Sequence, residues 1–142
     1  MGQNERELLP RLVLPNLPWS MSEPIPSSIA DLMDAAADYD QRLGKRADLK
    51  ELEVEFPARS LDVQFSTWDR PSDTGGWIET KRVIPIRFEH DPSYAAILLK
   101  LHTATHAYLS GSDKHFFEGL ELLSESNTGG ALAPAYYLCL GS

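Results

Sequence analysis

The spacing of apolar residues changes period along the chain, and this change constrains the fold more than any other sequence feature. Apolar side chains recur at helical intervals over residues 28–43 and again over 92–110. Between these segments, and after the second, they alternate with polar residues as in half-buried strands, over 52–88, 115–123 and 135–140. The order predicts an α+β fold, in which an antiparallel β-sheet has two helices packed on one face.

Capping residues delimit the two predicted helices. Ser28 can cap the first helix, Asp31 adds a carboxylate to its first turn, and Gly44 is a typical C-terminal stop. Asp91 is the expected N-cap of the second helix, with Pro92 at its first helical position. The second helix should bury one apolar stripe, which comprises Tyr94, Ile97, Leu98, Leu101, Ala104 and Tyr108.

Three alternating segments between the helices predict an antiparallel meander. In the first, Leu52, Val54 and Phe56 alternate with three glutamates. The second covers residues 61–65, and the third runs from residue 77 to residue 88. Because Pro85 cannot donate a backbone hydrogen bond, we expect the far end of the third strand to lie at a sheet edge or to carry a bulge.

The N-terminal segment is rich in proline and still apolar. Residues 1–26 contain five of the ten prolines, together with several leucines and Trp19. Proline at this density excludes a long helix or a central strand, so we expect an extended arm. The 142 residues are then a single domain, with the arm at 1–26 and the α+β core at 27–142. The arm either packs on its own domain or docks on a neighbour, as in a structural subunit or adaptor of a larger assembly.

Composition excludes several functional classes. The formal net charge of −8 leaves no basic face for nucleic acid, and we expect no nucleic-acid partner. No apolar run is long enough for a membrane span, and the first residues do not form a secretory signal. The single cysteine, Cys139, cannot form a disulfide within the chain and lies in an apolar run typical of a buried side chain. We therefore expect a cytoplasmic protein without membrane contact.

A histidine cluster is the leading candidate for chemistry. His102 and His106 share one face of the second helix, and Asp113 and His115 follow shortly after it. Three or four such ligands could hold zinc, which would give a metal-binding domain or a hydrolase. However, the zinc-protease motif requires glutamate directly after its first histidine, where this chain has Thr103. The alternative, which we favour, places the histidines between the apolar stripe and water, with no metal, no cofactor and no enzymatic activity.

Aromatic and acidic residues around one hairpin favour protein binding. Trp68 and Asp69 precede the loop at 70–76, Asp73 lies at its tip, and Trp77 follows it. Tryptophan buries a large area with few rotamers and is enriched at interface hot spots. Glu51 and Glu53 add negative charge that would attract a basic partner. These six residues form the candidate partner-binding site, although the tryptophans could instead cover the sheet.

The C-terminal half resembles a known class of binding proteins. Gly111-Ser112-Asp113-Lys114-His115-Phe116-Phe117-Glu118-Gly119-Leu120 and the ending Tyr137-Leu138-Cys139-Leu140-Gly141-Ser142 are similar to segments of small bacterial immunity proteins. Gly76-Trp77-Ile78-Glu79 and Asp91-Pro92-Ser93-Tyr94 look similar too, so the resemblance covers about residues 75–142. It implies a non-enzymatic inhibitor that binds and neutralises a cognate toxin. The expected partner is a bacterial toxin domain with a basic surface.

Overall fold

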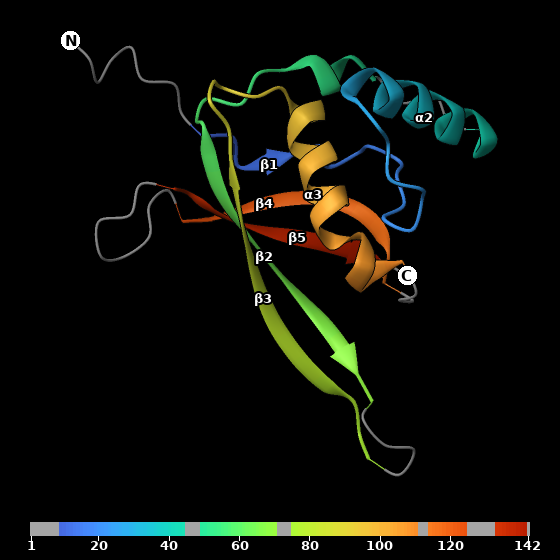
Figure 1. The fold of residues 1–142 in the computed structure, drawn as a ribbon, viewed down its shortest axis with the longest axis vertical. Coiled ribbons are helices and arrows are strands. Elements are labelled where there is room, and N and C mark those ends of the chain that lie inside the picture. The colour runs from blue at the N-terminus through green and yellow to red at the C-terminus, as the bar shows by residue number, and fades with distance from the viewer. Residues whose placement is uncertain (1–8, 45–48, 71–74, 111–113, 125–132, 142) are drawn as a thin grey trace.

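Five strands form one sheet, one helix lies across one of its faces, and a second helix packs against the first (Figure 1). The computed structural model describes residues 9–44, 49–70, 75–110, 114–124 and 133–141. The strands are β1 (Leu12–Val13), β2 (Ser60–Asp69), β3 (Ile78–Arg87), β4 (Phe116–Ser124) and β5 (Ala135–Gly141), arranged in the order β1-β4-β5-β2-β3. The helices are α2 (Ile29–Arg42) and α3 (Tyr94–Leu109), and a 3-10 helix, η1, spans Leu49–Glu53. The α+β class predicted from the sequence is confirmed.

The sheet is mixed, where the sequence predicted antiparallel pairing throughout. β2 pairs with β3, β4 with β5 and β1 with β4 in antiparallel fashion, but β2 and β5 run parallel. The parallel pair aligns Val63 with Tyr136. β5 lies between β4 and β2 and pairs antiparallel with β4, so the direction of β5 depends on that of β4. The direction of β4 depends in turn on the path of the chain through α3, which joins β3 to β4. This long-range pairing leaves no local signal in the sequence.

The second helix begins later than predicted. Ser93, and not Asp91, is the N-cap: its hydroxyl accepts a hydrogen bond from the backbone N–H of Ala96 at 3.1 Å. The preceding residues are held extended, because the Phe56 N–H donates to the Pro92 carbonyl at 2.7 Å and the Tyr94 N–H donates to the Val54 carbonyl. The cap of α2 is as predicted, with Ser28 accepting from the Asp31 N–H.

The buried stripe of α3 also differs from the prediction in its C-terminal half. Tyr94, Ile97, Leu98 and Leu101 are buried as expected, but Ala104 and Tyr108 are exposed. The face turned inward there consists of His102, Thr105 and Leu109. A helical stripe can include polar side chains when neighbouring elements supply hydrogen bonds, and here the Thr105 hydroxyl donates to the Leu101 carbonyl at 2.8 Å.

The segment predicted as the first strand of the meander forms η1 instead. Leu52 and Phe56 are fully buried, whereas Val54 is 44% exposed, so the alternating pattern does not reflect a strand. Glu55 forms an isolated bridge with Ser93. The following strand fits the prediction: Leu61, Val63 and Phe65 of β2 are buried in alternation and face the helices.

The described part of the N-terminal segment packs into the core of its own domain. Val13, Leu14, Trp19 and Met21 are each no more than 1% exposed, and β1 pairs with the edge of β4. Gly119 of β4 permits this approach. It has a φ of +100°, and a Cβ atom there would lie 2.9 Å from the Pro15 Cα. Leu14, Leu17 and Trp19, which could have contacted a neighbouring protein, are thus buried within this chain.

Candidate functional site

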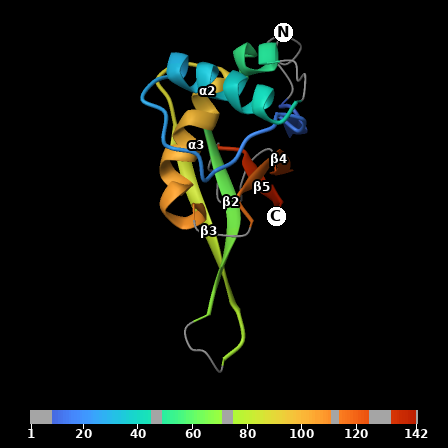
Figure 2. The same ribbon diagram turned by 90° about the vertical axis from the view of Figure 1, so that its right-hand side faces the viewer.

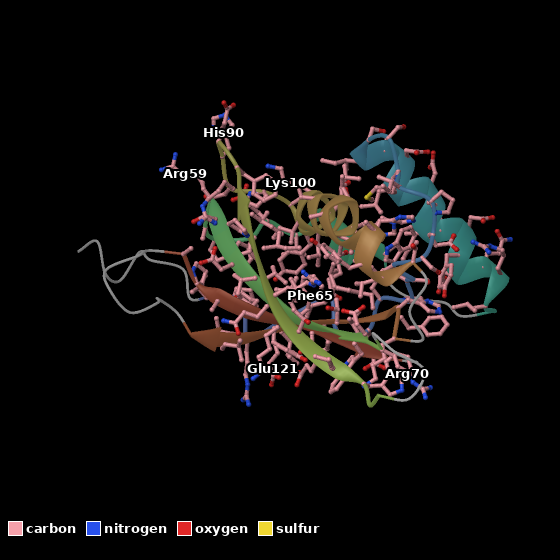
Figure 3. All side chains as sticks on the ribbon, turned by 60° about the horizontal axis from the view of Figure 1, so that its bottom comes forward. Arg59, Phe65, Arg70, His90, Lys100 and Glu121 are labelled. Atoms are coloured by element: carbon pink, nitrogen blue, oxygen red, sulfur yellow. The ribbon has the colours of Figure 1, made fainter. Side chains whose placement is uncertain are left out.

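Within the described residues, no helix or strand covers the face of the sheet opposite α3. In side view, α3 lies along one side of the sheet, α2 packs against α3 at one end of the molecule, and the β2–β3 hairpin projects well beyond both helices (Figure 2). Side chains follow the same division: Phe65 lies between the sheet and α3, while Glu121 points away from the helices (Figure 3). We call this uncovered surface of β2, β3, β4 and β5 the open face.

Strand alternation explains which side chains reach the open face. Because Leu61, Val63 and Phe65 point towards the helices, the intervening residues of β2 point the other way. Ser66 and Trp68 therefore lie on the open face. The described residues enclose a hollow of about 240 Å³ there, lined by Ser66, Trp68, Glu79, Lys114, Glu118, Tyr137, Leu138, Cys139 and Leu140.

The hollow combines an exposed aromatic ring with charged side chains of both signs. The Ser66 hydroxyl donates to Glu79 Oε2 at 2.5 Å, which holds that carboxylate against β2. Lys114 Nζ lies 5.8 Å from the centroid of the Trp68 ring, within range of a cation–π contact. The Trp68 ring stays 46% exposed beside these charged groups. The site presents an exposed aromatic surface that a partner could cover.

Cys139 lies at the edge of this hollow but is not activated. Burial raises the pKa of its thiol, and the carboxylates of Glu121 and Glu118 raise it further. The thiolate is the reactive form of cysteine, so this environment works against nucleophilic chemistry near neutral pH. Cys139 is half-buried, which places it between the buried position predicted and an exposed one.

The structure separates the predicted partner-binding residues into two groups. Trp68, Asp69 and Trp77 lie together along the projecting half of the hairpin, where Trp77 is 64% exposed. Glu51 and Glu53 belong to η1, which lies at the opposite end of the molecule (Figure 1). Asp73 lies outside the described residues.

Sequence reasoning missed several residues of the hollow. Lys114, Glu118 and Tyr137 approach Trp68 from β4, β5 and the residues leading into β4. The exposed position of Tyr137 could have been found from the alternation of β5. Its position beside β2 could not, because that follows from the parallel pairing of Gln64 with Tyr137.

His102 is fully buried, where the sequence placed it at the boundary with water. Trp19 Nε1 donates to His102 Nδ1 at 3.1 Å, and His102 Nε2 lies 2.7 Å from the Glu23 carbonyl oxygen. Since an indole N–H can only donate, Nδ1 must be the acceptor and Nε2 must carry the proton. Burial lowers the pKa of His102, more than the Glu23 carbonyl and carboxylate raise it. The neutral ring therefore holds the N-terminal segment with both of its nitrogens.

The other two candidate histidines do not complete a metal site with His102. The His106 ring centroid is 5.4 Å from that of His102, and His115 Nδ1 lies 2.7 Å from the Ser20 hydroxyl oxygen. Within the described ranges, no three His, Cys, Asp or Glu side chains are placed to bind one ion. Asp113 falls outside those ranges. The described contacts of His102 and His115 thus serve to attach the N-terminal segment to α3 and β4.

No family model, no curated protein and no solved structure matches this chain. The resemblance to immunity proteins therefore stays a prediction from the sequence. Among the described helices, none has the length and apolar character needed to cross a membrane.

Proposed function

We propose that this chain is a non-enzymatic binding module that neutralises a bacterial toxin domain in the cytoplasm, as an immunity protein does. The observation that carries the proposal is the exposure of Trp68 and Trp77, at 46% and 64%, on a hairpin that projects from the body of the domain. Large aromatic side chains left in water on a protruding element are typical of interface anchors. The open face around Trp68 forms the binding surface.

The charge of the chain supports a basic partner. The formal net charge is −8, and exposed Glu79, Glu118 and Glu121 lie on or beside the open face. Acidic groups around an aromatic anchor attract a basic surface over long range and speed its encounter. The positive charge of Lys114 beside the Trp68 ring reduces the negative charge next to that ring. The carboxylates therefore attract a basic partner mainly from the positions around Trp68.

Co-purification from the native host, followed by a growth assay, tests this proposal. We expect one stoichiometric partner to co-purify with the tagged chain. Expression of that partner alone should arrest growth, and co-expression of this chain should restore it. A captured protein that is harmless, or whose toxicity this chain does not relieve, contradicts the immunity function.

Paired substitutions then locate the binding surface. Trp68→Ala should weaken binding of the purified partner by tenfold or more, about 1.4 kcal/mol, as expected for an aromatic hot spot. Leu43→Ala is the matched control, because Leu43 is 49% exposed at the end of α2, a helix that contributes no residue to the hollow at Trp68. Isothermal titration calorimetry measures the affinity of each variant for the purified partner. Equal affinities for the two variants would exclude the open face as the interface.

A further inference from the structure

Within the part of the chain that the structure describes, the outer edge of β3 has backbone groups without a hydrogen-bond partner. In the sheet order β3 is terminal, and its described partner is β2 alone. The Phe88 N–H donates to the Arg59 carbonyl at 2.8 Å, which makes Arg59 and Phe88 a hydrogen-bonded pair. Opposed pairs in an antiparallel ladder alternate between bonded and non-bonded types. The even-numbered residues of β3 therefore bond to β2, and the odd-numbered residues direct their backbone N–H and C=O groups outward.

Two observations agree with this assignment. Pro85, which has no N–H, falls on an outward-directed position, where it leaves the β2–β3 ladder intact. The Arg87 carbonyl, also outward-directed, accepts a hydrogen bond from Lys100 Nζ at 2.6 Å and so has its partner outside the ladder. Among the described residues, the corresponding backbone groups of Glu79, Lys81 and Val83 have no such partner. An edge of this kind is a template for another strand.

The sequence of this edge is complementary to itself. If a second copy of β3 lies antiparallel with Thr80 on the two-fold axis, Glu79 of each copy stands opposite Lys81 of the other. In the same register Trp77 stands opposite Val83, and these side chains are 64% and 58% exposed in the single chain. By alternation Glu79, Lys81 and Val83 of β3 lie on the open face, and Trp77 directly precedes the strand. Opposite charges and an apolar pair at directly opposed positions both stabilise antiparallel strands.

Residues that commonly protect an edge strand do not block this register. Pro85 lies beyond the paired segment 77–83. Lys81 meets a carboxylate of the other copy, so its charge favours the pairing. Arg82 is held by its own chain: its Nε donates to the Thr67 hydroxyl at 2.9 Å, and its guanidinium lies 4.3 Å from the centroid of the Tyr108 ring.

We propose that two copies of this chain form an isologous dimer through the outer edges of β3, with Thr80 at the axis. Each opposed pair of outward-directed residues exchanges two backbone hydrogen bonds across the axis. The dimer goes beyond the proposed function and does not depend on it, because it forms from this chain alone.

Charge reversal at the two opposed positions tests the register. Sedimentation equilibrium of the wild-type chain should show a dimer. Glu79→Lys alone and Lys81→Glu alone each place like charges opposite one another and should weaken the dimer by tenfold or more. The double variant Glu79→Lys/Lys81→Glu restores opposite charges and should dimerise as the wild type does. An equimolar mixture of the two single variants should form a heterodimer, because every opposed charge is then matched.

Urea unfolding of each variant at micromolar concentration shows whether its monomer is intact, so that loss of the dimer is not confused with loss of the fold. A wild-type chain that stays monomeric at about 1 mM overturns the proposal. So does a dimer that the single reversals leave unchanged, or one that the double variant fails to restore, since either result places the interface elsewhere. These measurements use no toxin, so their failure is distinct from failure of the proposed function.

Discussion

Replacing Trp19 by phenylalanine should destabilise the domain far more than the same replacement at an exposed tryptophan. The Trp19 indole is 1% exposed and donates its N–H to the fully buried Nδ1 of His102 at 3.1 Å. Its ring also packs 6.0 Å from that of Tyr39 and 5.5 Å from that of His102, measured between centroids. Trp19→Phe removes the donor and part of the ring while leaving the His102 acceptor buried.

The expected cost follows from these contacts. A buried acceptor without a donor costs about 1–3 kcal/mol. The lost part of the ring adds about 0.5–1.5 kcal/mol, as for other partial truncations in a close-packed core. Together these contributions should lower the free energy of unfolding by about 1.5–4.5 kcal/mol, a large fraction of the stability of a domain of this size.

Urea unfolding followed by far-UV circular dichroism measures this difference without relying on tryptophan fluorescence. Trp77→Phe is the matched control, because Trp77 is 64% exposed and its replacement should change the free energy by less than about 0.5 kcal/mol. A loss for Trp19→Phe no larger than that of the control would refute the reasoning, because the buried hydrogen bond would then contribute nothing measurable.

Three further predictions concern stability. Because burial lowers the pKa of His102, the folded state binds fewer protons than the unfolded chain once the pH falls below about 6.5. Unfolding free energies in a pH series should therefore decrease from about pH 6.5 downward until the folded-state pKa is passed, and His102→Gln should lack this component. Gly119→Ala should cost more than about 2 kcal/mol in urea unfolding because of the positive φ and the close approach of the N-terminal segment, whereas Gly76→Ala, with open space around its Cβ position, should be nearly neutral. Ser28→Ala should lower stability by about 1 kcal/mol in thermal melts through loss of the α2 cap, and an unchanged midpoint would show that the cap is dispensable.

Local patterns in the sequence determined the type of most elements. The alternation of Leu61, Val63 and Phe65 predicted β2 and its buried face, and Ser28 marked the beginning of α2. Pro85 indicated that the far end of β3 lies at a sheet edge or carries a bulge, and the sheet order shows the edge. Local rules worked here because backbone geometry sets the period of buried side chains, and because a cap or a missing N–H acts within a few residues.

The tertiary structure alone decided which element each apolar side chain meets. Leu52, Val54 and Phe56 have the spacing of a strand, yet contacts with the start of α3 and the core fold them into η1 and its continuation. His102 has no local signal for burial, because its partners Trp19 and Glu23 are 83 and 79 residues away in sequence. The hollow at Trp68 likewise depends on the parallel pairing of β2 with β5. A periodic pattern predicts which face of an element is buried. The free energy of packing distant segments against one another determines which segment covers that face.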